Sequence, residues 1–239
     1  MFHDIQGVME HKIDNQQDYN LSENQKQVLL TGVFGDGCIT NKVKGCSYST
    51  NSIHKEYVEK KKYLLGELVR TEVRESVNRG YKQNTIYSFA SLSSKDVKIF
   101  IQRPLKSLLK DMTDLGLALW FYDDGSLHKK NLFYNLNTHK FSKEEHEEIL
   151  FPFFRSWGLE PQLFVDKKKD GRIFYYTYFG KHFGAYKISN LLAKYSINCY
   201  NYKLWSSETI QKWSKLEAQL KSEGLTVTPR KFTNMLGKI

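Results

Sequence analysis

The chain has 239 residues, and its 36 Lys and Arg against 26 Asp and Glu leave a formal net charge of +10. Three cysteines, Cys38, Cys46 and Cys199, are too few and too irregularly spaced for a disulfide framework or a zinc site. The sequence has no apolar run of the roughly 20 residues that cross a membrane and no recognisable signal peptide. We therefore expect an intracellular protein without a membrane partner, in a bacterial or phage-host cytoplasm or an organelle matrix.

The positive charge is unevenly distributed along the chain. Residues 1–30 carry five acids and two bases, a balance of −3, so the remaining residues carry +13. Clustered positive charge favours a polyanion such as nucleic acid, because binding releases the counterions of the phosphates. A solvated lysine surface is the alternative, since only seven of the basic residues are arginines.

The elements are predicted from capping residues and apolar spacing. A capping box formed by Ser22 and Gln25 opens a helix to Asp36, and Thr113–Asp124 follows as a helix that is apolar on every face. A second capping box, Ser142 with Glu145, opens a helix toward Trp157. The turn at Asp170-Gly171 predicts a hairpin. The further predicted elements are strands at 85–90, 162–165 and 173–178 and helices at 94–101, 182–195 and 206–220.

The two halves of the chain resemble each other. Asp36-Gly37 ends the first apolar helix, and Asp124-Gly125 ends the second one 88 residues later. The segment Tyr48–Asn51 corresponds to Tyr134–Asn137. We infer an internal duplication. The predicted organisation is a polar extension at 1–20, repeats at 21–110 and 111–205, and a C-terminal helix and tail at 206–239.

Each of the two apolar helices ends in an aspartate. The partial negative charge of a helix C-terminus disfavours a carboxylate there. If the duplication produces a pseudo-two-fold axis, Asp36 and Asp124 also repel each other, and bound Mg²⁺ would relieve both penalties. Two alternatives are an ordinary Asp-Gly turn and the paired-aspartate motif of reverse transcriptases at Phe121–Asp124, for which the chain is short.

The two motifs, Leu29-Leu-Thr-Gly-Val-Phe-Gly-Asp-Gly37 and Leu117-Ala-Leu-Trp-Phe-Tyr-Asp-Asp-Gly125, resemble those of single-chain LAGLIDADG homing endonucleases. The resemblance implies an α+β saddle of two pseudo-symmetric αββαββα repeats, with the motif helices at the centre and the sheets over double-stranded DNA. It also implies a monomer that makes double-strand breaks with 3′ overhangs at a long asymmetric target. Two or three Mg²⁺ ions at the helix ends, replaceable by Mn²⁺, would serve as cofactors.

The same resemblance suggests residues for the active site. Asp36 and Asp124 match the metal-binding acids, and the backbone carbonyls of Gly35 and Asp123 match further metal ligands. The resemblance also suggests residues that lie near the metals or complete the site, namely Lys203, Asn137, its counterpart Ser49, and, as first-half candidate for the basic residue, Arg103. Because the first half has no clear partner for Lys203, the two strands are expected to be cut at different rates.

Antiparallel strands that enter the major groove would read the DNA. Candidate readers in the first half are Lys42, Lys44, Ser47, Arg70, Arg74, Asn78, Arg79, Tyr81 and Lys82. Candidates in the second half are Lys129, Asn131, Asn135, Lys167, Lys169, Arg172, Tyr175 and Tyr178. About half of the strand residues should face away, since alternate side chains point to opposite faces. Lys60, Lys61 and Lys62 are predicted to lie on the solvent side of a helix.

A second class of function stays open at this stage. A LAGLIDADG-fold RNA-splicing maturase, with intron RNA as its partner, or a non-catalytic DNA-binding regulator would share the fold. Retention of both Asp36 and Asp124 favours the enzyme, because a protein that only binds DNA does not need them.

Overall fold

Two consecutive runs of the order α-β-β-α-β-β-α make up the fold. The computed structural model describes residues 20–78, 84–128, 133–180 and 183–224. The first run comprises α1 (Glu23–Phe34), β1 (Cys38–Lys42), β2 (Gly45–Ser52), α2 (Lys55–Leu65), β3 (Arg74–Asn78), β4 (Asn84–Ala90) and α3 (Lys95–Ile101). A short 3-10 turn, η1 (Gly66–Leu68), follows α2, and α4 (Leu105–Lys110) connects the two runs.

The second run repeats this order with one irregular helix. It comprises α5 (Asp114–Asp124), β5 (Gly125–His128), β6 (Phe133–Leu136), α6 (Lys143–Glu145), the π-helical η2 (His146–Leu150), α7 (Phe151–Ser156), β7 (Pro161–Lys167), β8 (Ile173–Phe179) and α8 (Phe183–Lys194). The 3-10 turn η3 (Asn198–Lys203) and α9 (Ser207–Ser222) complete the described chain. The predicted α+β fold with two αββαββα repeats is confirmed. The predicted domain boundaries stay predictions.

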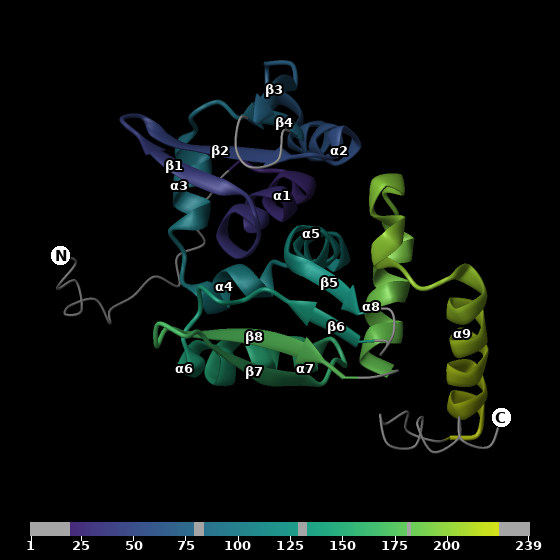
Figure 1. Ribbon diagram of the computed structural model, residues 1–239. Coiled ribbons are helices and arrows are strands. Elements are labelled where there is room, and N and C mark those ends of the chain that lie inside the picture. The colour runs from purple at the N-terminus through teal and green to yellow at the C-terminus, as the bar shows by residue number, and fades with distance from the viewer. Residues whose placement is uncertain (1–19, 79–83, 129–132, 181–182, 225–239) are drawn as a thin grey trace.

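Each run forms one four-stranded antiparallel sheet. The strand orders are β1-β2-β4-β3 and β5-β6-β8-β7, so the two sheets have the same topology. In Figure 1 the central pair α1 and α5 lies between the two sheets, which flank it on opposite sides. The saddle predicted for the duplicated sequence therefore has its two motif helices at the centre.

Both predicted capping boxes start helices. Ser22 accepts a hydrogen bond from the N–H of Gln25, whose side chain accepts one from the N–H of Ser22. Ser142 and Glu145 form the same reciprocal pair, but the helix passes into a π turn at His146. Such pairs satisfy the N–H groups that a helix start leaves without partners.

The seam between α1 and α5 is the core of the molecule. Residues 116–122 of α5 are all buried, as predicted for a helix that is apolar all round. Gln27 of α1 donates to the carbonyl of Asp111 (2.8 Å) and accepts from the N–H of Thr113 (2.9 Å), the N-cap of α5. A Cβ on Gly116 would lie 2.1 Å from the Gln27 side chain, so only glycine permits this approach.

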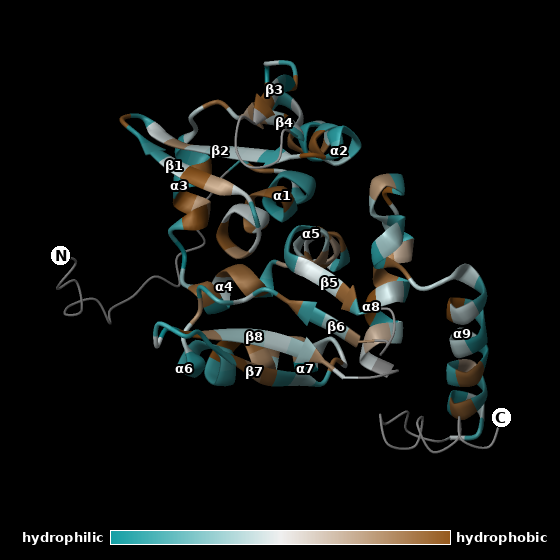
Figure 2. Ribbon diagram, viewed as in Figure 1, coloured by the Kyte–Doolittle hydropathy of each residue, from teal (hydrophilic) through white to brown (hydrophobic). Residues whose placement is uncertain are grey.

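The C-terminal helix α9 packs beside α8. Figure 2 shows a hydrophobic and a hydrophilic side on α9, and Trp213, Leu216 and Leu220 are buried. The predicted helix at 206–220 is present as α9. Over the described parts of the chain, no helix combines the length and apolar character that a membrane span requires.

We predict that Gln27→Ala lowers the free energy of unfolding by about 2 kcal/mol, because a buried backbone donor and acceptor at the start of α5 lose their partner. Equilibrium urea denaturation measures this change. Gln211→Ala, on the exposed side of α9, is the matched control and should change stability by less than about 0.5 kcal/mol. Equal effects of the two substitutions would contradict the bridging role of Gln27.

Candidate active site at the ends of the central helices

The two motif aspartates lie where α1 and α5 end side by side. Gly35 caps α1 through its N–H to the carbonyl of Thr31, and Asp36 follows, whereas Asp124 is the last residue of α5. A Cβ on Gly35 would lie 2.5 Å from Oδ2 of Asp123. The missing side chain of Gly35 therefore leaves the space in which the two chain segments meet.

The carboxyl groups of Asp36 and Asp124 interact directly. Burial, the negative charges of Asp36 and Asp123 and a hydrogen bond with Asp36 raise the pKa of Asp124 to about 8. Burial and the charge of Asp123 also raise the pKa of Asp36. Two carboxylates this close cannot both ionise without cost, so in the absence of a cation they hold a proton at neutral pH.

The side chain of Asp123 is bound by groups of the protein next to this pair. Its carboxylate accepts hydrogen bonds from Nζ of Lys61 at 2.8 and 2.9 Å and from the hydroxyl of Tyr57 at 2.6 Å. It also accepts a long bond from the N–H of Asp36 (3.3 Å). The Asp123 side chain is therefore occupied within the protein, and only its backbone carbonyl corresponds to the predicted metal ligand.

The prediction that Lys61 faces solvent is wrong. Its side chain is 0% exposed. Burial lowers the pKa of Lys61, but Asp123 and Tyr48 together outweigh this effect and hold the pKa above its usual range. A buried ammonium is tolerated only when paired and hydrogen-bonded. The sequence contains a signal for this burial, because Lys61 falls at helical spacing between the buried residues Tyr57, Val58, Leu64 and Leu65.

Lys203 lies at the C-terminus of α5. Its Nζ donates to the carbonyl of Tyr122 (2.5 Å) and, at longer range, to that of Phe121 (3.4 Å). Burial lowers the pKa of Lys203 to about 8, and the three aspartates 36, 123 and 124 oppose this decrease. A cation here compensates both the unpaired carbonyls of the helix end and the cluster of carboxylates.

Asn137 lies next to Asp124, but its first-half counterpart is not Ser49. The N–H of Asn137 donates to the carbonyl of Asp124 (3.0 Å). Ser49 instead pairs with Cys38, and continuing the register of that hairpin by two residues brings Asn51 opposite Asp36. The two hairpins differ in length, so an equal offset along the sequence selects the wrong residue.

Arg103 lies away from the carboxylate pair. Its guanidinium forms an ion pair with Asp111 and donates to the hydroxyl of Ser107 (2.6 Å). Asp111 precedes the start of α5, about 15 Å along the helix from Asp124 at 1.5 Å per residue. The candidate for a first-half partner of Lys203 is therefore bound at the opposite end of the central helix.

Lys140 is a basic group near the site that sequence reasoning missed. It lies in the turn after β6, where desolvation lowers its pKa and Asp124, Asp123 and Asp36 oppose the decrease. The only hint in the sequence is its position three residues after Asn137.

The predicted DNA readers of the first sheet lie largely on one face. Strand register places Lys42 and Ser47 on the face that carries Ser49, and Arg74 joins it through Ser88. Asn78 pairs with Asn84 at the end of β3. The opposite face carries the buried Tyr48 and Phe89. Lys44 lies in the turn between β1 and β2, and Arg70 precedes β3. Arg79, Tyr81 and Lys82 lie outside the described residues.

The predicted DNA readers of the second sheet lie on different faces of that sheet. Asn135 pairs with Tyr178 on the face opposite the buried Tyr134 and Leu136. Tyr175 has the other parity and lies with its ring centroid 6.2 Å from that of the buried His146, so its prediction as a reader is wrong. Lys167, at the end of β7, lies on the same face of the sheet as Tyr175. Lys169 and Arg172 lie at the β7–β8 turn, where Arg172 pairs with Asp170. Lys129 and Asn131 lie outside the described residues.

The donor set fits a hard divalent cation. Among the described residues, no cluster of three or more His, Cys, Asp or Glu side chains is arranged to hold a metal. Mg²⁺ nevertheless binds proteins through one or two carboxylates and keeps water or phosphate as its other ligands. Asp36 and Asp124, whose pKa values are raised by burial and by neighbouring carboxylates, supply such a pair.

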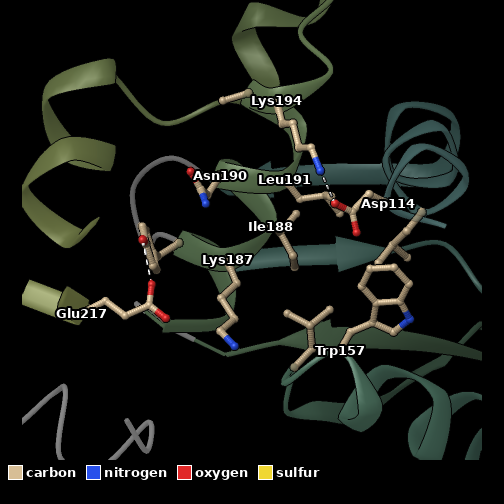
Figure 3. A pocket seen from close by; sticks show the side chains of 12 residues that line it. Asp114, Trp157, Lys187, Ile188, Asn190, Leu191, Lys194 and Glu217 are labelled. Carbon is tan, nitrogen blue, oxygen red and sulfur yellow. Dashed lines mark hydrogen bonds and ion pairs between the residues drawn. The ribbon is translucent and has the colours of Figure 1, made fainter. Parts of the chain in front are cut away.

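The structure also has a cavity away from the carboxylate pair. A cavity of about 550 Å³ is lined by α8, α9 and the start of α5 (Figure 3). Four of its polar side chains are paired with one another, since Lys194 binds Asp114 (2.5 Å) and Glu217 accepts from the hydroxyl of Tyr186 (3.0 Å). It opens at the opposite end of α5 from Asp124 and is separate from the carboxylate pair.

Residues 26–185 match the LAGLIDADG DNA endonuclease family. No curated protein sequence matches the chain significantly. The homing endonuclease I-WcaI bound to its DNA recognition sequence has a similar structure, with a TM-score of 0.64 and 23% identity over 80% of this chain and 89% of that chain. Full-length DUF199/WhiA from Thermatoga maritima gives 0.51 and 9% identity over 93% and 68%. At these identities the likenesses show the fold alone.

We predict that Lys61→Met lowers the free energy of unfolding by about 3–5 kcal/mol, because Asp123 is left as an unpaired buried charge. The double variant Lys61→Met/Asp123→Asn should be less destabilised than the sum of the two single variants. Urea denaturation of all four proteins gives the coupling free energy. Lys194→Met breaks the exposed pair with Asp114 and should change the stability far less. Additive effects of the Lys61 and Asp123 substitutions would contradict the ion pair.

Proposed function

Because the chain belongs to the LAGLIDADG DNA endonuclease family, we propose that it is a homing endonuclease that makes metal-dependent double-strand breaks with 3′ overhangs at a long asymmetric DNA target. The observation that carries the proposal is the direct interaction of the Asp36 and Asp124 carboxyl groups at the paired ends of α1 and α5. A protein that only binds DNA gains nothing from this costly arrangement.

In this proposal the carboxylates of Asp36 and Asp124 and the carbonyls of Gly35 and Asp123 hold Mg²⁺ or Mn²⁺. Bound divalent ions in such a site lower the pKa of water and stabilise the attacking and leaving oxygens of phosphodiester hydrolysis. Lys203 has its ammonium group fixed by the Tyr122 carbonyl, so it can stabilise negative charge on the phosphate without first being ordered. Asn137 orients the water through its amide.

DNA is proposed to lie across the two uncovered sheet faces. Side chains on these faces include Lys42, Arg74 and Asn135, and β-ribbons of this kind fit the major groove. The lysine-rich turns at Lys44 and at 167–169 would contact phosphates. Because the two repeats differ in sequence, one chain presents two different surfaces, which suits an asymmetric target and a monomer.

We predict that the wild-type chain with Mg²⁺ linearises a plasmid that joins the two sequences flanking its reading frame. Asp36→Asn and Asp124→Asn should each slow cleavage at least about 100-fold, because each removes a charged metal ligand. Asp114→Asn, at the other end of α5, is the matched control and should cleave normally. Cleavage by either active-site variant at the wild-type rate would refute the assigned site. Binding of intron RNA without DNA cleavage would favour the maturase.

We further predict that divalent ions bind more tightly as pH rises toward 8 and displace a proton from the carboxyl pair near pH 7. The reason is that the pKa of Asp124 is raised to about 8, so the free site is protonated at neutral pH. Calorimetric titration with Mn²⁺ in buffers of different ionisation enthalpy counts the released protons. Asp124→Asn should release none, and a wild-type titration without proton release at pH 7 would contradict the raised pKa.

The raised pKa of Asp124 also makes the stability of the metal-free protein depend on pH. A carboxyl whose folded pKa exceeds its unfolded value binds its proton more tightly in the folded state. The metal-free protein should therefore lose stability as pH rises from about 4 to about 8, and Mn²⁺ should restore it. A urea titration across this range measures the effect, and Asp124→Asn should show a smaller pH dependence than the wild-type chain, since only the raised pKa of Asp36 remains.

A further inference from the structure

Helix α2 belongs to the first repeat, but its inner side lies against groups of the second. Lys61 and Tyr57 of α2 hold the carboxylate of Asp123, which comes from α5. Tyr57 also donates to the carbonyl of Leu119 (3.1 Å) on the same helix. The side chains of α2 therefore fix the last turn of α5, and through Oδ2 of Asp123 they reach the N–H of Asp36.

The same helix also holds the segment that carries Lys203. Glu56, in the first turn of α2, accepts hydrogen bonds from the N–H groups of Asn198 and Cys199, both at 3.1 Å. These amides begin η3, the turn that ends at Lys203. Because both oxygens of one carboxylate are used, Glu56 fixes the start of η3 bidentately.

Aromatic contacts continue this attachment to the ammonium group itself. The ring of Tyr200 lies 4.8 Å from His54 and 5.0 Å from Tyr57, measured between centroids, and stacks on Tyr122 at 5.1 Å. Nζ of Lys203 lies 4.8 Å from the centroid of the same ring. Tyr200 thus packs between α2 and α5 and forms one wall around Lys203.

Among the residues that the structure describes, the other half holds no copy of this arrangement. An offset of 88 residues brings Gly35 to the position of Asp123 and Ile149 to that of Lys61. Allowing for the extra residue of the π turn, the equivalent of Lys61 is Leu150, which is also aliphatic. The duplication therefore supplies no second pair of this kind.

We propose that α2 is the positioning element of the reaction, in which Lys61 and Tyr57 place the Asp36–Asp124 pair through Asp123, and Glu56 places Lys203 across the repeat boundary. The inference rests on the proposed endonuclease function. None of these three α2 residues touches the DNA phosphate in the reaction; each acts through a neighbour. Since Glu56 holds only the segment that carries Lys203, loss of Glu56 should affect one strand more than the other.

The test compares Glu56→Gln with Glu59→Gln. Both residues are exposed on α2, but Glu59 pairs only with Lys55 at 3.7 Å. In single-turnover cleavage of a supercoiled target with Mg²⁺, Glu56→Gln should slow one strand about tenfold, so that nicked plasmid accumulates. DNA affinity without divalent ions and the melting temperature should match those of Glu59→Gln. Equal slowing of both strands, or equal rates for the two variants, would overturn the proposal.

A second pair of variants tests the contact with Asp123. Tyr57→Phe removes only the hydroxyl that binds Asp123 and should lower the cleavage rate constant about fivefold without changing DNA affinity. Tyr63→Phe, on the exposed side of the same helix, is the matched control and should change neither. An unchanged rate constant in Tyr57→Phe would remove Tyr57 from the positioning role.

Hydrogen–deuterium exchange supplies a readout that does not depend on cleavage. In Glu56→Gln the amides of residues 198–203 should exchange at least about threefold faster than in Glu59→Gln, because two of them lose a charged acceptor. Unchanged exchange would overturn the attachment of η3 to α2. A wild-type chain that cuts no DNA would instead contradict the proposed function, and exchange would still decide whether Glu56 holds the segment.

Discussion

Three aspartates meet where two helices end, and much of the polar interior of the molecule compensates that concentration of negative charge. Helix C-termini already carry partial negative charge, so Asp36, Asp123 and Asp124 would be unfavourable here without compensation. Lys61 neutralises Asp123 from one side, and Lys203 covers the free carbonyls from another. What remains is a single shared carboxyl pair that is open to a cation.

Lys61 and Lys203 compensate negative charge in different ways. Lys61 is enclosed completely and is bonded to one carboxylate, which fixes its charge and its place. Lys203 is bonded to neutral carbonyls, and burial brings its pKa to about 8, so its proton is held less tightly than that of an ordinary lysine. The first arrangement is suited to holding structure, and the second is the one that the proposed reaction would use to stabilise a phosphate.

Sequence reasoning predicted the fold because its evidence was local and repeated. Capping boxes at Ser22 and Ser142 mark helix starts, and the repeat of Asp-Gly after 88 residues indicates two equivalent halves. Each capping box and each Asp-Gly motif is formed by residues that lie within one helical turn of each other in the sequence. Short sequence motifs also indicate Asp36, Asp124 and Lys203 as site residues, and the structure brings all three to one place.

The failures have separate causes, namely a partner that is distant along the chain, a connection outside the repeats, and strand register. Lys61 finds Asp123 62 residues away, so nothing near it in sequence announces a buried ion pair. Arg103 is bound by Asp111 on the connection between repeats, where the duplication gives no guide. Tyr175 was misassigned because one residue of register moves a side chain to the other face of a sheet. Ser49 was chosen by an offset that ignores the different lengths of the two hairpins.

The placement of Lys61 and Asp123 on different repeats has a consequence for the history of the molecule. A duplicated gene often descends from a half-length chain that paired with itself. A homodimer of the second half would bring two copies of Asp123 to its axis, and only the aliphatic Ile149 or Leu150 would face them. A homodimer of the first half would have two copies of Lys61 and no partner acid. The halves have become dependent on each other, so separation would leave each with an uncompensated buried charge that no symmetric pairing can neutralise.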